Sequence, residues 1–169
     1  KDLWEVETPN IAEFKVIYTY YACELNAGSS YLDAEQLYVN PVNCCVYIPN
    51  PMNEACVLEI KVPGQYQIAI DLPAATEKNQ FVSTNFDRLA DAPFIASDKL
   101  QHQIISTSNH HFHLWFMGDV KPDWERLNTD FKRFCDVQVD MMGDLPASDY
   151  HFYFQILPTA FYQNPQSRR

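Results

Sequence analysis

Short stretches with a two-residue hydrophobic period run through the chain as far as Met117, and they predict strands. In the stretch from Glu13 to Leu25, Phe14, Val16, Tyr18 and Tyr20 alternate with the residues between them. Comparable stretches follow at 37–48, 56–62, 66–72, 100–107 and 111–117. Asn40-Pro41 interrupts the stretch at 37–48. A short polar turn at Ser108-Asn109 separates the last two, which therefore predict an antiparallel hairpin.

A helical pattern replaces the strand pattern between Pro122 and Met142. One mostly apolar stripe is predicted there, formed by Trp124, Leu127, Phe131, Phe134, Gln138 and Met141. Pro122 suits a first helical position, and the acidic residues Asp123 and Glu125 suit the positive end of the helix dipole. Gly143 is a natural C-terminal stop. A last alternating stretch, Tyr150 to Leu157, predicts one more strand.

This order of elements predicts a mainly β fold with a C-terminal α+β segment. We expect an antiparallel β-sandwich-like domain, followed by one long helix and a strand. The boundary is expected near Gly118 to Lys121, which divides the chain into residues 1–118 and 119–169. The stretch 73–98 shows no clear period, and its only helix-like part is too short for a full helix before Pro93.

Composition narrows the function classes. The chain has 169 residues, long enough for a core without metal or disulfides, and 47% of them are apolar. Its formal net charge of −10 argues against a nucleic-acid partner, which would need a basic surface. No apolar run reaches the length of about 18 residues that would span a membrane. No glycine motif for binding phosphate occurs.

Histidines form the densest group of potential metal ligands. His110, His111 and His113 are close in sequence, and His111 and His113 would share one face of a strand. That is how a strand presents two imidazoles to zinc, and His102 would be the third ligand across the hairpin. The alternative is a solvent-facing hairpin side opposite a core of Phe112, Leu114 and Phe116. We favour the alternative and predict no metal ligand.

The acidic residues and cysteines carry no catalytic signature. Asp87, Asp91 and Asp98 lie in loop-like sequence, and nothing indicates that they converge as an acid/base pair. Cys135 has no histidine beside it to activate a nucleophile. The five cysteines lack metal or redox C-x-x-C spacing, so buried reduced thiols are expected at Cys23, Cys44, Cys45, Cys56 and Cys135. We predict no catalytic and no cofactor-binding residue.

Three stretches together resemble the N-terminal, non-catalytic region of the glycyl aminopeptidase family of zinc metallopeptidases. They are LADAPFIAS at 89–97, HFHLWFMGDVKPDWERLNTDFKRF at 111–134 and GDLPASDYHFYFQILPTAFY at 143–162. Trp4-Glu5-Val6 and the loop from Ser30 to Asp33 fit the same region. The resemblance covers roughly residues 3–162.

The resemblance implies that a thermolysin-like catalytic domain accompanies this region. In the family a β-sandwich-like N-terminal domain precedes that domain, which holds zinc through an H-E-x-x-H helix, and a PDZ-like domain commonly follows. This sequence contains no H-E-x-x-H, and the resemblance implies that it is shortened at both ends. The resemblance further implies that the helix and strand at 119–169 are the start of the catalytic domain, after an antiparallel N-terminal domain at 1–118. The expectation is a chain that is no enzyme alone, with zinc and the peptidase chemistry in the absent part of the catalytic domain.

The same resemblance implies the partners. The absent catalytic domain is the expected partner, packed beside this region so that the region walls one side of its cleft. An exposed apolar patch is then expected around the helix at 122–142 and the terminal strand, and the same patch would allow a homo-oligomer. The cellular location stays open between a bacterial periplasm or cell envelope and a cytoplasm.

Two other functions remain open at this point. One is a stand-alone β-rich module that binds a protein or a carbohydrate through aromatic side chains. The other is a small metalloprotein that uses His102, His111 and His113.

Overall fold

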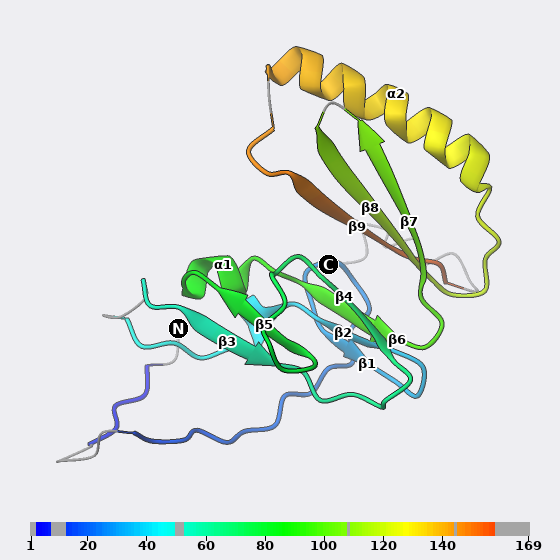
Figure 1. The fold of residues 1–169 in the computed structure, drawn as a ribbon. Helices are drawn as coiled ribbons and strands as arrows, with labels where there is room; N and C mark the ends of the chain where they lie inside the picture. Colours follow the sequence, from blue (N-terminus) through cyan, green and yellow to red (C-terminus); the bar gives the residue numbers. More distant parts are fainter. Residues whose placement is uncertain (1–2, 8–12, 50–52, 108, 144, 158–169) are drawn as a thin grey trace, which may run out of the picture.

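Three sheets and two α-helices form the fold of the computed structural model, which describes residues 3–7, 13–49, 53–107, 109–143 and 145–157 (Figure 1). In chain order the elements are β1 (Tyr31–Leu32), β2 (Leu37–Val39), the 3-10 turn η1 (Pro41–Asn43), β3 (Cys56–Glu59), β4 (Gln67–Ile70), β5 (Gln80–Ser83), α1 (Phe86–Ala90), β6 (Phe94–Ser97), β7 (Gln101–Thr107), β8 (His110–Met117), α2 (Trp124–Met142) and β9 (Asp149–Gln155).

The first sheet, called sheet A here, contains β1, β2, β6 and β4 in that order, and all its pairs are antiparallel. Strand β6 lies inside this sheet and is buried at each of its four positions. Phe94 faces one core and Ile95 faces another, because both faces of the sheet are covered. Sheet A is therefore the middle layer of the fold.

Sheet B covers one face of sheet A. It consists of the antiparallel pair β3 and β5, in which Cys56 lies opposite Ser83. Side chains of both sheets and of α1 share one core, which includes Ile60, Ile70, Leu72, Leu89, Ala92 and Phe94. Two packed antiparallel sheets form the expected sandwich-like arrangement.

Sheet C and α2 form a second unit, drawn in the upper part of Figure 1. Its strand order is β7-β8-β9, where β7 and β8 are an antiparallel hairpin and β8 and β9 run parallel. A parallel pair needs a crossover connection, and α2 supplies it. The helix covers one face of the sheet through Trp124, Leu127 and Phe131, around a core of Ile105, Phe112, Leu114, Phe116 and Cys135.

The opposite face of sheet C packs on sheet A. Trp115 and Met117 of β8 join Tyr38, Ala69 and Ile95 of sheet A in one core. The layers are therefore sheet B, sheet A, sheet C and α2, and this stacking places the two units in apolar contact.

The structure confirms the expected fold class: mainly β with antiparallel sheets, then one long helix and a strand. Asp123 caps α2, since its side chain accepts a hydrogen bond from the Arg126 N–H, so Pro122 precedes the helix rather than opening it. Gly143 ends the helix with a φ of 83°. Ser108 of the expected hairpin turn lies outside the described residues.

Other element predictions were wrong. Residues 13–22 form no strand, and only Cys23 makes an isolated bridge, to Tyr31. The second stretch ends as a strand at Val39, and residues 44–49 belong to no strand. In α2, Phe134 and Met141 of the expected apolar stripe are exposed, because the side facing the sheet continues from Phe131 to Cys135 instead.

Candidate functional site

A cluster of histidines occupies the face of sheet C that looks away from α2. His102 of β7, His113 of β8 and His151 of β9 meet there, and their strand register explains why. His113 lies opposite His151, and the two rings stack with centroids 4.4 Å apart. His102 stacks on Trp115 at 3.6 Å and places its Nε2 3.1 Å from the Nδ1 of His113. The cluster therefore spans all three strands.

Polar partners fix the orientation of these rings. The Nε2 of His113 lies 3.2 Å from the Asp149 carboxylate, and the Trp115 indole N–H donates to the Nδ1 of His151 at 3.2 Å. Asp149 also accepts from the Ser148 hydroxyl at 2.6 Å, and this hydrogen bond, together with His113, lowers the pKa of its carboxyl. Imidazole nitrogens in this cluster are thus engaged with neighbouring protein groups.

Burial and mutual repulsion keep two of the imidazoles neutral. Loss of water around His151, reinforced by the nearby His113, lowers its pKa to about 4. The same two causes lower the pKa of His102. Placing several protonated imidazoles so close together would be costly, so the cluster favours uncharged, stacked rings.

The zinc hypothesis for His102, His111 and His113 finds no ligand set in the described part of the chain. Among the residues that the structure describes, no group of three or more His, Cys, Asp or Glu side chains could hold a metal ion. His102 and His113 do meet, as the zinc hypothesis required, but the exposed His111 places its Nδ1 2.9 Å from the Ser106 hydroxyl. Phe112, Leu114 and Phe116 fill the core on the other face, as the alternative to a zinc site expected. The same alternative was wrong in expecting the histidine face to be solvent-facing, because Trp115 and Met117 of that face are buried against sheet A.

Sequence reasoning missed two members of the cluster, His151 and Asp149. His151 lies in the strand predicted at 150–157, and Asp149 comes directly before it. That strand was not expected beside β8. The parallel pairing through α2 brings them there. A βαβ pattern at 110–155 would have been the signal.

The other candidates do not converge. Asp87 and Asp91 are exposed on α1 and at its C-terminal end, and Asp98 is exposed after β6. Cys135, on the sheet-facing side of α2, is only 2% exposed, which makes it a core residue. Of the five cysteines expected to be buried, only Cys135 is: Cys44, Cys45 and Cys56 are half-buried, and Cys23 is exposed.

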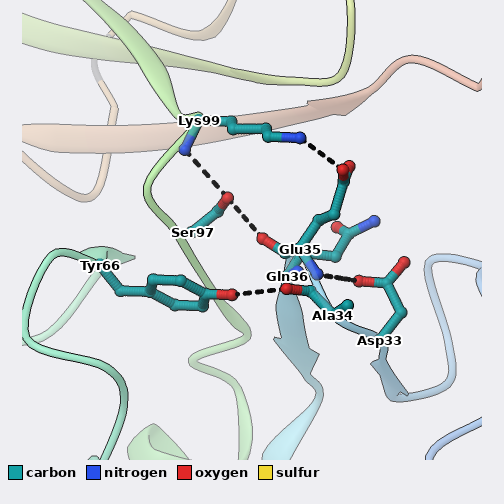
Figure 2. A network of polar contacts seen from close by, with 7 residues as sticks. All are labelled: Asp33, Ala34, Glu35, Gln36, Tyr66, Ser97 and Lys99. Atoms are coloured by element: carbon teal, nitrogen blue, oxygen red, sulfur yellow. Dashed lines mark hydrogen bonds and ion pairs between the residues drawn. The ribbon is translucent and has the colours of Figure 1, made fainter.

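A polar network joins the two units at the chain connection between them (Figure 2). The Ser97 hydroxyl donates to the Glu35 carbonyl oxygen at 2.6 Å and accepts from the Lys99 N–H at 3.0 Å. Lys99 also forms an ion pair with the Glu35 carboxylate, and this contact raises the pKa of the lysine. Through Ser97 and Lys99 the loop between β1 and β2 is held on the β6–β7 connection. Tyr66, just before β4, holds the same loop from another side by donating to the Ala34 carbonyl at 3.2 Å.

The comparisons with known proteins bear on what these units are. The family model described as the peptidase M61 N-terminal domain matches residues 1–98, more than half of the chain. The chain belongs to this family. The expected relation to the N-terminal region of zinc metallopeptidases is therefore confirmed, and with it a non-catalytic part of a peptidase-like protein.

A solved structure supports the fold of this M61 N-terminal domain. It is the crystal structure of an aminopeptidase N family protein from Idiomarina loihiensis, 23% identical, with a TM-score of 0.77. The match covers 84% of this chain and 25% of that one, so this chain spans about a quarter of that protein's length. No curated protein matches the chain. Among the described residues, no helix has the length and apolarity needed to cross a bilayer.

Proposed function

We propose that this M61 N-terminal domain packs against the catalytic domain of a zinc aminopeptidase-like protein and forms one wall of its cleft. The family match and the aminopeptidase N family structure support this role. The chain itself would be inactive, because its sequence lacks the H-E-x-x-H that would bind zinc and activate water. Zinc would lie in the partner domain.

The outer edge of β9 carries this proposal. Among the described residues, β9 pairs with β8 on one side only, at the end of the order β7-β8-β9. A seven-residue edge strand presents free backbone N–H and C=O groups, which favour addition of another strand. The family resemblance makes this strand part of the start of the catalytic domain and places the rest of that domain after it. The edge is therefore a natural place for the catalytic domain to continue sheet C.

Apolar side chains on α2 supply a second contact surface. Phe134, Val137 and Met141 are 54%, 49% and 74% exposed, at spacings of three and four residues that put them on one side of the helix. Ile156, just after β9, is also exposed. We name Phe134, Val137 and Met141 the helix stripe. Its exposure matches the patch expected around the helix and the terminal strand.

The division into residues 1–118 and 119–169 stays a prediction. Strands β7 and β8 fall in the first part, although they share sheet C with β9 of the second part. Limited proteolysis followed by mass spectrometry separates the possibilities. Cleavage near 118–121 would support the division, whereas cleavage near 98–100 would place the whole of sheet C in the second unit.

Association with a separately expressed catalytic domain tests the packing. Val137→Asp in the helix stripe is expected to weaken binding at least about tenfold, because it places a charge in an apolar contact. Val57→Asp is the matched control, since Val57 is also exposed, at 65%, but lies on β3. Equal binding by both variants would remove the helix stripe from the interface.

An activity assay tests the absence of catalysis. The purified 169-residue chain is incubated with zinc and with peptides that carry an N-terminal glycine or alanine. We expect no release above the blank. Zinc-dependent release that a chelator abolishes would overturn the proposal.

A stand-alone binding module remains the second candidate, and one observation favours it. The segment 13–21, which lies outside every strand, exposes several aromatic rings: Phe14 at 48%, Tyr18 at 46%, Tyr20 at 44% and Tyr21 at 85%. Stacking on aromatic rings is a common way to bind a flat ligand. Quenching of tyrosine fluorescence by a carbohydrate panel, abolished in Tyr21→Ala, would support this candidate over the first.

A further inference from the structure

The segment 13–21 continues from the outer edge of sheet A but pairs with no strand. Directly after it, Ala22 accepts a hydrogen bond from the Leu32 N–H of β1 at 3.0 Å, and Cys23 bridges to Tyr31. The backbone N–H and C=O groups of 13–21 make no hydrogen bond to any residue that the structure describes. Figure 1 shows this segment in blue along the lower side of the molecule. A row of open backbone groups at a sheet edge favours the addition of another strand.

Side-chain exposure shows that 13–21 has the shape of a strand although it lacks a partner. Its even-numbered apolar side chains are only 39% to 48% exposed: Phe14, Val16, Tyr18 and Tyr20. By contrast, Ile17 and Tyr21 are 82% and 85% exposed. This alternation is typical of a strand with one face toward the protein and one toward solvent. The Tyr18 hydroxyl donates to the Cys44 carbonyl oxygen and so anchors the inward face.

The hydrogen bond at Ala22 also determines which backbone groups are open. In an extended strand, successive residues point their N–H and C=O groups to opposite edges. Because the Ala22 carbonyl points to β1, the odd-numbered residues of 13–21 point their backbone groups to the outer edge. Ile17, the middle residue of the segment, therefore presents its N–H and C=O there.

The composition of the segment favours a second copy of the same chain as the added strand. Its sequence, EFKVIYTYY, consists largely of β-branched and aromatic residues and contains neither Gly nor Pro. One acidic and one basic residue give it a net charge of zero, in a chain whose net charge is −10. Two copies therefore meet here without the repulsion that opposes contact elsewhere on their surfaces. High β-propensity with low net charge is the signature of segments that pair with identical segments.

We propose that two copies of this chain pair antiparallel through residues 13–21, so that sheet A continues across a two-fold axis at Ile17. In this register Ile17 lies opposite Ile17 of the second copy, and all residues of the segment are paired. The inward face then joins aromatic side chains with aromatic or β-branched ones, Phe14 with Tyr20 and Val16 with Tyr18. Cross-strand pairs of these kinds stabilise antiparallel sheets.

The outward face is compatible with the same register. Lys15 lies opposite Thr19 of the second copy, so no like charges face each other. A two-fold contact uses the same surface on both copies and closes on itself, which limits the assembly to a dimer. The contact lies on the sandwich, at the opposite side of the molecule from α2 (Figure 1), so it is independent of the proposed contact with a catalytic domain.

Sedimentation of the 169-residue chain over a concentration series tests the dimer. We expect the mass to rise toward twice that of one chain. Ile17→Lys should raise the dissociation constant at least about tenfold, because it places two ammonium groups directly opposite each other. Val57→Lys is the matched control, since it adds the same charge at an exposed position of β3. Circular dichroism checks that both variants are folded. A chain that stays monomeric, or equal dimerisation of both variants, would overturn the proposal.

Cross-linking tests the register. In a Cys23→Ser background, Ile17→Cys places two thiols opposite each other, with Cα atoms about 5.5 Å apart, which suits a disulfide. Thr19→Cys is the control on the same face, because its Cα would lie about 13 Å from that of the second copy. With copper phenanthroline we expect disulfide-linked dimers at least about tenfold faster from Ile17→Cys. Equal rates would overturn the register. A dimer lost in Val137→Asp but kept in Ile17→Lys would overturn the proposal by assigning the contact to the helix stripe.

Discussion

Gly118 lies directly against the backbone of Ile156, at the point where β8 and β9 end side by side. A Cβ on Gly118 would be 2.4 Å from the Ile156 carbonyl oxygen, and Gly118 has a φ of +121°. Next to it, the Ile156 N–H donates to the Met117 carbonyl oxygen at 2.8 Å. The close approach therefore closes the end of the parallel pair, and only glycine fits there without a shift.

Replacement of this glycine should destabilise the fold. Gly118→Ala adds a clash with backbone and strain at a positive φ, so we expect the free energy of unfolding to fall by about 2–4 kcal/mol. Gly64→Ala is the control, because nothing lies within 4 Å of a Cβ at that position. Urea denaturation measures both. Equal stability of the two variants would contradict the close approach.

Ser97 should matter more than the ion pair beside it. Its hydroxyl is fully buried and makes two hydrogen bonds, to Glu35 and from Lys99. Ser97→Ala leaves these groups unpaired and should cost about 1–3 kcal/mol of unfolding free energy. Lys99→Met removes an ion pair between exposed side chains and should change stability less. Thermal melts of both variants would show the ranking, and a larger loss in Lys99→Met would refute it.

The histidine cluster predicts lower stability in acid. The pKa of His151 is about 4 in the folded chain and about 6.5 in the unfolded chain. Between these two pH values the unfolded chain therefore binds a proton at His151 that the folded chain does not bind. Stability should therefore fall as the pH drops through this range, by roughly 2 kcal/mol after allowance for partial exposure. His102, whose pKa is also lowered, adds to the loss.

Two variants test this pH dependence by chemical denaturation at several pH values. His151→Gln removes the buried titrating group and should flatten the profile between pH 4 and about 6.5. His111→Gln is the matched control, because it removes an exposed imidazole from the same strand pair. An unchanged slope in His151→Gln would assign the acid sensitivity to other groups.

Arg88 should stabilise the sandwich through a dual contact with Asp71. Its Nη2 donates to the Asp71 carbonyl oxygen at 2.6 Å and to the carboxylate at 2.8 Å. Arg88→Met should cost about 1 kcal/mol, as expected for a half-exposed, charge-assisted pair. Lys61→Met is the control, because its ion pair with Glu59 is 3.4 Å long and highly exposed. Guanidinium denaturation measures both variants. A larger loss of unfolding free energy in Lys61→Met than in Arg88→Met would contradict this prediction.

The elements with a clear period were predictable. The helix at 124–142, its stop at Gly143 and the hairpin of β7 and β8 follow local rules of periodicity and capping. Strand β6 was not predicted, because both of its faces are buried and the apolar-polar alternation that marks a half-exposed strand is absent. Segment 13–22 failed in the opposite way: it has the alternation, but it has no strand partner in the described structure beyond the bridge of Cys23.

The candidate sites also contain features that local sequence predicts and features that depend on tertiary contacts. Sequence spacing placed His111 and His113 on one face and Cys44 beside Cys45, since strand geometry and covalent adjacency are local. Only the tertiary structure brought His151 to His113, because their contact depends on a crossover through α2. The sequence alone thus determined the family, the fold class and the local turns. The layer order, the parallel strand and the neighbours of each polar group were decided by packing between residues far apart in the chain, which local periodicity does not encode.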